Sequence, residues 1–185
     1  MKGAGLILTA ALVILVVDAR EPKLGKSKFK PKKGGIQEAF VNWHNRFRRK
    51  HRVRDLKYHS DLGAMARNWA SHIAYYDLYQ HRPQSGSMRY GENIYWLTNV
   101  RGKVKINPKD VVTYWYDEIR MYDYSRPYFD SRTAHFTQIV WKATEYVGCG
   151  WAHNPQTKVL FVVCNYWQQG NMEGQFRANV LRKIY

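Results

Sequence analysis

The sequence predicts an α+β domain in which helices cover a small sheet, and three observations support this class. Apolar residues recur at helical spacing in three segments of the first two thirds of the chain. Two strand-like runs flank a turn signal in the C-terminal part. Hydrophobic residues make up 45% of the 185 residues and charged residues 24%, which excludes a disordered or collagen-like chain. Helices followed by a shorter strand-bearing part indicate a layered domain with the hairpin at its centre.

The first 19 residues have the features of a secretory signal peptide. A lysine follows the initial methionine, an apolar run covers Leu6–Val17, and the segment ends on the small residue Ala19. The apolar run is about a dozen residues, shorter than the ~20 that a membrane-spanning helix needs. We therefore expect cleavage after residue 19 and a secreted, extracellular protein.

Residues 20–35 form a basic segment that we expect to be a flexible arm, followed by a single domain over residues 36–185. The segment holds seven Lys and Arg residues, one Glu, and the prolines Pro22 and Pro31. The whole chain carries 30 Lys and Arg against 14 Asp and Glu, a formal net charge of +16. Such a charge predicts an anionic partner. Because the expected secretion disfavours nucleic acid, the partner is predicted to be a polyanionic glycan or an anionic membrane surface.

The first helix is predicted over residues 36–50 from one apolar stripe with His44 at its edge. The stripe consists of Ile36, Phe40, Trp43 and Phe47. Basic residues gather toward the end of this segment, and we expect them on its solvent-exposed face, where cations also suit the helix dipole. They are Arg46, Arg48, Arg49, Lys50, Arg52 and Arg54.

A second helix is predicted to begin at Ser60-Asp61, which are good capping residues, and to end before Pro83. Its apolar side holds Leu62, Met65, Ala66, Trp69 and Ile73. His81 then lies just past the end of this helix. A turn entering a short aromatic strand follows at residues 91–96.

A third helix is predicted from Asn107-Pro108, a cap followed by a first-turn proline, through Tyr122. Glu118 projects within its apolar stripe, whereas Asp117 points away. A carboxylate on a buried face needs a partner or a proton, because an unpaired buried charge is costly. Two interpretations stay open, a functional carboxylate and a core glutamate paired with an Arg or a Tyr. The stripe itself consists of Val111, Trp115, Ile119 and Tyr122.

The two cysteines, Cys149 and Cys164, are predicted to form a disulfide across a hairpin. The turn signal of residues 154–157 lies between strand-like runs at residues 147–152 and 158–163, which places the sulfur atoms opposite each other. Pairing is expected in the oxidising compartment to which the leader directs the chain. A loop of this size stabilises a fold by about 3 kcal/mol on the chain-entropy model.

Several segments together resemble the CAP superfamily, which includes cysteine-rich secretory proteins, antigen 5 and pathogenesis-related 1 proteins. The resemblance spans about residues 36–181 and implies a three-layer α-β-α sandwich with a central antiparallel sheet. With two cysteines the chain is a cysteine-poor form of such a protein. The segments, in chain order, are His44-Asn45-x-x-Arg48, Gly91-Glu92-Asn93-Ile94, the run from His135 to Trp141, Val147-Gly148-Cys149-Gly150, Cys164-Asn165-Tyr166 and Gly170-Asn171.

The resemblance also implies a shallow cleft that holds two histidines and two glutamates. By position these are His81, Glu92, Glu118 and His135. Imidazole and carboxylate groups are suited to zinc or another divalent cation. Arg82 follows the first histidine, and we expect its guanidinium to pair with Glu92 or Glu118, which lowers the affinity for a cation.

An aromatic segment resembles the caveolin-binding type of motif found in some members of the superfamily, and this implies binding of sterol or fatty acid. Its aromatic residues are Tyr122, Tyr124 and Phe129. Flat rings beside a proline-fixed loop can cover an apolar molecule. The alternative, that these rings pack on the protein's own core, stays open.

The sequence therefore favours a non-enzymatic binding module over an enzyme. It contains neither an HExxH helix nor a GxSxG turn, and no motif places a serine nucleophile. The alternative function is an extracellular interaction protein that docks on polyanions through its basic arm and has an inert cleft. The sequence does not define the oligomeric state.

Overall fold

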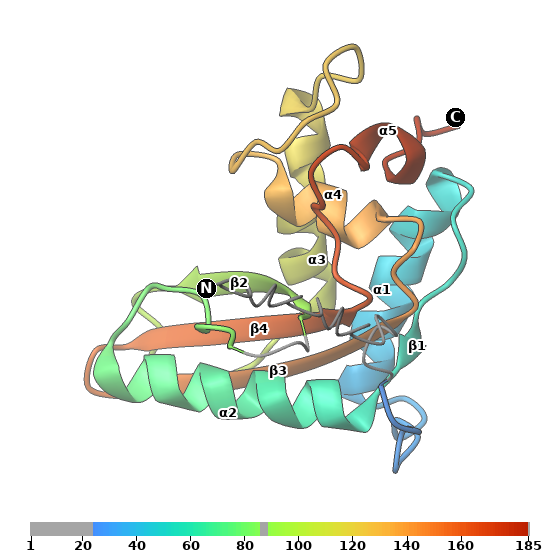
Figure 1. Ribbon diagram of the computed structural model, residues 1–185. Coiled ribbons are helices and arrows are strands. Elements are labelled where there is room, and N and C mark those ends of the chain that lie inside the picture. Colours follow the sequence, from blue (N-terminus) through green and yellow to red (C-terminus); the bar gives the residue numbers. More distant parts are fainter. Residues whose placement is uncertain (1–23, 86–88, 185) are drawn as a thin grey trace, which may run out of the picture.

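The computed structural model describes residues 24–85 and 89–184, and Figure 1 shows the arrangement of their elements. The predicted leader lies outside the described residues, as do residues 20–23 of the predicted arm. The elements are α1 (Ile36–Lys50), β1 (Lys57–Tyr58), α2 (Ser60–Tyr76), β2 (Gly91–Leu97), α3 (Pro108–Tyr116), the 3₁₀-helix η1 (Asp117–Met121), α4 (Ala134–Val140), β3 (Tyr146–Asn154), β4 (Val159–Trp167) and α5 (Phe176–Asn179).

The strands form one four-stranded sheet in the order β1-β3-β4-β2. The pairs β3 with β4 and β2 with β4 are antiparallel, as expected. The short strand β1 pairs in parallel with β3, so the sheet is mixed, with the predicted antiparallel pairing at its centre and one parallel pair at its edge. This pairing is non-local, and periodicity within one segment carries no information about it.

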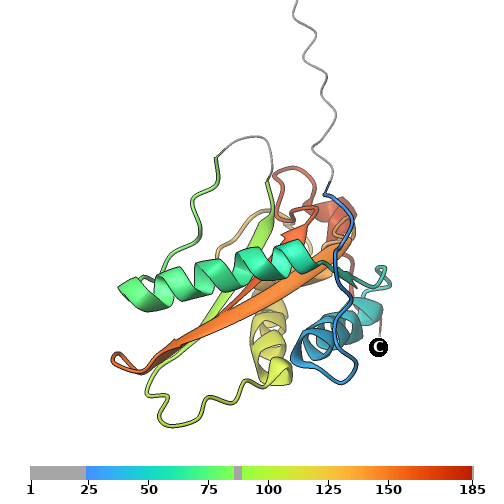
Figure 2. The same ribbon diagram turned by 90° about the horizontal axis from the view of Figure 1, so that it is seen from below.

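Helices cover both faces of the sheet, as the predicted sandwich requires. Helix α2 lies across strands β3 and β4 on one face, while α1, α3 and α4 lie on the other (Figure 1). Figure 2 shows the crossing of α2 over the sheet from below. The larger hydrophobic core fills the second interface, around Phe40, Trp115 and Phe136, and a smaller core around Trp69 and Ile73 fills the first.

Two glycines let α2 approach strand β3 closely. A Cβ atom built on Gly148 would lie 2.2 Å from the backbone nitrogen of Gly63, and one on Gly150 would lie 2.2 Å from that of Arg67. No side chain fits at either distance. The VGCG segment therefore has a packing role in which glycine is required by space.

The predicted helix starts are confirmed, and one predicted helix end is corrected. The His59 ring caps α2 by accepting the Asp61 N–H, and the Asn107 side chain caps α3 by accepting the Lys109 N–H. Helix α3 ends at Tyr116, where the chain tightens into η1 instead of continuing to Tyr122. The tighter turn still buries Glu118 more than Asp117, because their side chains are 13% and 50% exposed.

Arg48 is fully buried, which corrects its prediction as part of an exposed basic face. Its guanidinium donates to the carbonyl oxygens of Arg54, Ile139, Trp141 and Thr144 at 2.7–3.0 Å. Burial lowers its pKa to about 10, so it remains a cation. Four carbonyl oxygens replace the water that a buried guanidinium loses.

The described part of the predicted basic arm lies on the domain. The carbonyl oxygen of Gly25 accepts a hydrogen bond from the His59 ring at 2.7 Å, and the backbone N–H of Lys28 donates to the Ser60 hydroxyl at 2.9 Å. Lys28 also pairs with Asp61 at 3.8 Å. Residues 25–28 therefore contact the start of α2, and the flexibility of the arm over residues 20–35 stays a prediction.

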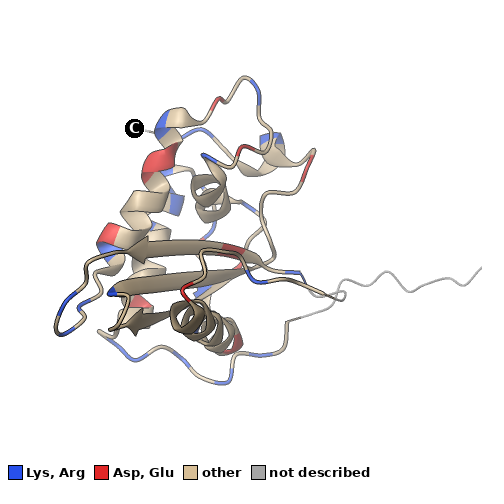
Figure 3. Cartoon of the chain, turned by 90° about the vertical axis from the view of Figure 1, so that its left-hand side faces the viewer, with Lys and Arg blue, Asp and Glu red and all other residues tan. Residues whose placement is uncertain are grey.

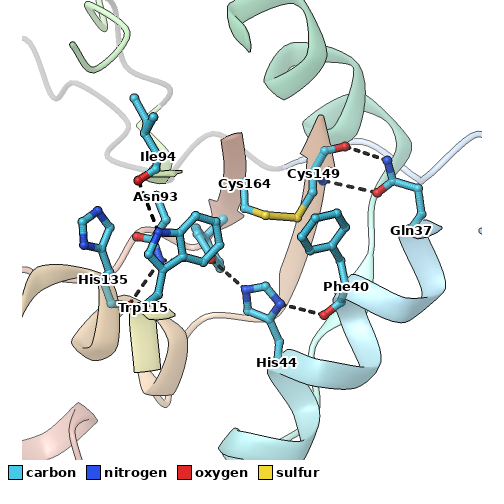
Figure 4. Close-up of a disulfide and its surroundings, with 10 residues drawn as sticks. Gln37, Phe40, His44, Asn93, Ile94, Trp115, His135, Cys149 and Cys164 are labelled. Carbon is cyan, nitrogen blue, oxygen red and sulfur yellow. Dashed lines mark hydrogen bonds between the residues drawn. A yellow bond between two sulfur atoms is a disulfide. The ribbon is translucent and has the colours of Figure 1, made fainter. Parts of the chain in front are cut away.

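The predicted disulfide between Cys149 and Cys164 is confirmed. The two residues are direct partners in the register of β3 and β4, and both are buried. On the other side of β3 the Gln37 side-chain amide donates to the Cys149 carbonyl oxygen at 2.6 Å and accepts its N–H at 3.4 Å (Figure 4). Gln37 thereby satisfies the strand edge that the two-residue β1 leaves unpaired.

Among the described residues, none of the helices has both the length and the apolar character needed to span a bilayer.

Candidate functional site

The first pair of predicted site residues is His81 with Glu92. The Nδ1 atom of His81 lies 2.8 Å from Oε1 of Glu92, at the start of strand β2. A carboxylate only accepts, so Nδ1 carries the hydrogen and donates. The His81 side chain is 64% exposed, whereas that of Glu92 is 3% exposed, so the buried carboxylate fixes an accessible ring.

The second pair is Glu118 with His135, and it also builds the start of helix α4. The Nδ1 atom of His135 donates to Oε1 of Glu118 at 2.6 Å. The other oxygen of Glu118 accepts the backbone N–H groups of His135 and Phe136 at 3.0 and 3.1 Å. These N–H groups at a helix start have no partner within the helix, so Glu118 caps α4 from η1. Its predicted need for a buried partner is met in this way.

Trp115 and Asn93 fix the position of His135 from two sides (Figure 4). The rings of Trp115 and His135 are stacked, with centroids 6.1 Å apart and planes 15° from parallel. The Trp115 indole N–H donates to the Ile94 carbonyl oxygen at 3.2 Å. The Asn93 amide donates to the His135 carbonyl oxygen at 3.2 Å. Helix α3 and strand β2 together therefore orient this histidine.

Behind this pair a buried polar chain runs from α1 to β2. His44 donates from Nδ1 to the Phe40 carbonyl oxygen at 2.7 Å, and its Nε2 lies 2.8 Å from the Tyr166 hydroxyl. That hydroxyl also accepts from the Asn93 amide at 3.2 Å. Burial lowers the pKa of His44 to about 4, and the charge of Arg48 acts in the same direction. Burial also raises the pKa of Tyr166, so both groups are neutral at pH 7.

The four predicted metal ligands form two separate pairs. Successive residues of a strand point to opposite faces, so Glu92 and its neighbour Asn93 reach different partners. Among residues 24–85 and 89–184 no group of three or more His, Cys, Asp and Glu side chains is arranged to hold a metal ion. Metal binding through His81, Glu92, Glu118 and His135 stays a prediction.

Arg82 contacts the pair of His81 and Glu92 through its backbone. Its N–H donates to Oε1 of Glu92 at 3.0 Å, so this oxygen serves both His81 and Arg82. The ion pairs of the described residues include none between the Arg82 guanidinium and Glu92 or Glu118. The guanidinium instead lies beside Tyr90, where it opposes the rise that burial causes in the pKa of that phenol. The expectation that the Arg82 guanidinium pairs with Glu92 or Glu118 is therefore wrong.

The aromatic segment that the sequence assigned to lipid lies mostly against the core. Tyr122 is buried and contacts both Tyr124 and Phe136 with ring centroids 4.8 and 5.6 Å apart. Tyr124 is half-buried and carries the guanidinium of Arg182 over its ring. Of the three predicted residues, Phe129 is the one that is exposed. This geometry favours the core-packing alternative, and lipid binding stays a prediction.

The sequence did not assign a role to the residues that support the cleft. His44, Asn93 and Tyr166 lie within the quoted motifs, and Trp115 lies in the predicted core stripe. The usable signal was the presence of several polar residues in segments that otherwise pattern as buried. Which of them meet one another depends on tertiary packing.

Comparison with known families and proteins gives one consistent result. The model of the cysteine-rich secretory protein family, CAP, matches residues 41–166. The chain is 35% identical over 160 residues to the Golgi-associated plant pathogenesis-related protein 1 of Homo sapiens. This match covers 85% of the chain and 97% of that protein.

Solved structures show the same fold at lower sequence identity. The structure of BmVAL-1 matches with a TM-score of 0.62 and 21% identity, covering 82% of this chain and 84% of that chain. The crystal structure described as NaASP2 with Zn²⁺ matches with a TM-score of 0.58 and 20% identity, covering 84% and 91% of the two chains.

Proposed function

Because the chain belongs to the cysteine-rich secretory protein (CAP) family, we propose that it is a secreted binding module whose cleft takes a divalent cation, zinc above all, through His81 and His135. The observation that carries this proposal is the pairing of each histidine with its own buried glutamate. The proposal assigns direct binding to the imidazoles and an orienting role to the carboxylates.

The hydrogen-bond pattern leaves the same nitrogen available on both rings. Each Nδ1 donates to a carboxylate, so in the neutral imidazole Nε2 carries the lone pair. No hydrogen bond within the described residues uses Nε2 of either ring. Metal-binding histidines typically donate their second N–H to a carboxylate, which fixes the tautomer and strengthens the ligand. The tautomers of both rings therefore suit zinc binding, with solvent completing the coordination.

Two protein ligands give a weaker site than the three or four of catalytic and structural zinc centres. The absence of a third ligand group within the described residues supports reversible binding over a permanent metal centre. The structural relative NaASP2 is described with Zn²⁺, but its 20% identity shows the fold alone. The argument for this chain therefore rests on its own imidazoles.

The same contacts favour binding over hydrolysis. Glu92 accepts from His81 and from the Arg82 backbone, and Glu118 accepts from His135 and two backbone N–H groups. Oε2 of Glu92 has no hydrogen-bond partner but is buried, whereas a general base needs an oxygen that a reacting group can reach. No described serine, threonine or cysteine donates to either cleft histidine. These features support the non-enzymatic alternative.

Secretion is part of the proposal and rests on the leader of residues 1–19. The buried disulfide agrees with an oxidising compartment, because such bonds persist there.

The test of the cleft is zinc titration by calorimetry on the wild type and on His81→Ala/His135→Ala. We expect the double variant to lose binding by at least about tenfold, since both ligands are removed. Binding by the wild type is expected to weaken as the pH falls, because a protonated imidazole cannot bind a metal.

The matched control is His72→Ala/His153→Ala, which removes two histidines outside the cleft. His72 is exposed beside Trp69, and His153 contacts the Val100 carbonyl oxygen. The control is expected to bind zinc as the wild type does, and thermal melting verifies that both variants fold. Unchanged zinc affinity in the cleft variant would contradict the proposal.

A further inference from the structure

A group of cations on α1, at the start of α3 and in the C-terminal segment includes four that lie over aromatic rings. We call it the basic strip and define it as Arg46, Lys50, Lys109, Arg182 and Lys183. All five side chains are exposed. From this arrangement we propose that the basic strip docks a sulfated glycan chain, independently of the cleft.

Neighbouring aromatic rings connect Arg46, Lys50 and Lys109 into one surface. The Arg46 guanidinium and the Lys109 ammonium lie over the same Trp43 ring, 4.9 and 5.7 Å from its centroid. The Lys50 ammonium lies 5.2 Å from the Phe47 ring and 5.7 Å from the Tyr116 ring. These contacts bridge the seam between α1 and α3.

The C-terminal segment extends the strip beyond the end of α1. The Ile184 N–H donates to the Lys50 carbonyl oxygen at 2.8 Å, which places residues 182–184 next to Lys50. The Arg182 guanidinium lies 4.8 Å from the centre of the Tyr124 ring. Figure 1 shows the C-terminal end beside the last turn of α1, and Figure 3 shows Lys and Arg positions on the helices near it.

The cations of the strip keep their charge available. No ion pair of the described residues includes Arg46, Lys50, Lys109, Arg182 or Lys183, whereas Arg49 on the same helix is paired with Asp55. The acids nearest in sequence on α3 and η1 are engaged elsewhere: Asp110 with the Asn107 amide and Asp117 with Arg120. Burial lowers the pKa of His51. The positive charges of Lys183, Lys50 and Arg48 lower it further.

An aromatic ring attracts a cation without neutralising it and restricts its rotamers, so less entropy is lost when an anion binds. Guanidinium groups also match planar pairs of oxyanion oxygens. A sulfated glycan presents a row of such anionic groups, which suits a row of fixed cations.

The geometry favours a glycan over a membrane surface. Phe47 and Tyr116 are 6% exposed each and lie beneath their cations, so these rings are not available for insertion into a bilayer. Stable docking on a membrane uses apolar side chains that enter the headgroup region together with the basic charge. A bilayer is therefore an alternative outcome of the test.

The test measures binding of a heparin oligosaccharide to the full mature chain at about 0.15 M salt and over a salt series. The variant Arg46→Gln/Lys50→Gln/Arg182→Gln removes three strip cations. We expect its affinity to fall by about tenfold or more, and the slope of log Kd against log salt to fall by about two, because three anion contacts are lost.

The matched control is Arg67→Gln/Arg101→Gln/Lys103→Gln, which removes the same charge outside the strip. Arg67 lies on α2 across the sheet, and the other two follow Val100, whose N–H contacts the Lys158 carbonyl oxygen. We expect its affinity to stay within about twofold of the wild type. A charge-retaining variant, Arg46→Lys/Arg182→Lys, should bind more tightly than the charge-removing strip variant, which separates charge from folding.

Equal losses in the strip variant and the control would overturn the proposal, because net charge alone would then explain binding. Binding to phosphatidylserine vesicles without binding to the oligosaccharide would also overturn it, in favour of a membrane. A strip variant that binds as the wild type does would have the same consequence. Zinc titration of the strip variant is expected to be unchanged, which keeps this proposal separate from the one on the cleft.

Discussion

His44 and Arg48 show how residues that pattern as polar serve the interior of this fold. They lie one helical turn apart on α1 and are both fully buried. His44 connects Phe40 to Tyr166, and Arg48 satisfies carbonyl oxygens at the end of α4. Each is stable in the core because every polar atom it brings there has a partner.

The buried His44 predicts a stability loss in acid. Its pKa in the folded protein, about 4, lies below the ordinary 6.5 expected for the unfolded chain. Between these pH values the His44 imidazole is protonated in the unfolded chain and neutral in the folded protein. The free energy of unfolding therefore falls as the pH drops from 6.5 to 4. The loss from this residue is about 3 kcal/mol when complete.

Urea unfolding of the wild type and of His44→Gln across this pH range measures the effect. The stability difference between the two proteins should shrink as the pH falls, since glutamine does not titrate. His72→Ala, which changes an exposed histidine, should keep the wild-type pH profile. Parallel profiles for the wild type and His44→Gln would show that His44 is not the titrating group.

At the scale of elements, helix α4 and strand β3 are positioned by contacts from distant segments. Glu118 of η1 satisfies N–H groups at the start of α4, and Arg48 of α1 satisfies carbonyl oxygens at its end. A helix of seven residues is marginal by itself, so these external caps compensate for its length. Strand β3 instead depends on small residues, because Gly148 and Gly150 face α2.

Gly148→Ala is expected to destabilise the protein by about 2 to 3 kcal/mol, because the added methyl group must displace the backbone of α2 from the sheet. Urea unfolding provides the measurement. Gly25→Ala is the control, since no atom lies within 4 Å of the added Cβ there, and it should change stability by less than about 0.5 kcal/mol. A neutral Gly148→Ala would mean that α2 is not seated closely on β3.

The central strands β3 and β4 connect the larger and the smaller hydrophobic core of the molecule. The disulfide joins β3 to β4, and these strands contact helices on both faces. Charge is distributed over many loops and helix ends, as Figure 3 shows, and the net charge of +16 opposes compaction. A covalent link at the centre of the sheet acts against this repulsion by restricting the unfolded chain.

Replacing the disulfide by Cys149→Ala/Cys164→Ala should lower the free energy of unfolding by about 3 kcal/mol, as expected for a loop of this length. Chemical denaturation of the variant and of the reduced wild type should give the same loss. Stability equal to that of the oxidised protein would refute a stabilising role for the bond.

The local features of this protein can be read from its amino-acid order alone. Caps and periodicity located the starts of α2 and α3, and the turn between Cys149 and Cys164 located the hairpin and its disulfide. The motifs identified the family, and helical phase indicated the burial of Glu118. Each of these depends on residues that are close in the chain, so the pattern contains the information.

The contacts between distant groups became visible only in the folded chain. In the folded chain Arg48 is buried in the core, and β1 pairs in parallel with β3. His81 contacts Glu92, and His135 contacts Glu118. Folding also places the C-terminal segment beside α1, which creates the basic strip. These outcomes depend on contacts between residues far apart in the chain, and such contacts form only when the two sides of the sheet are packed.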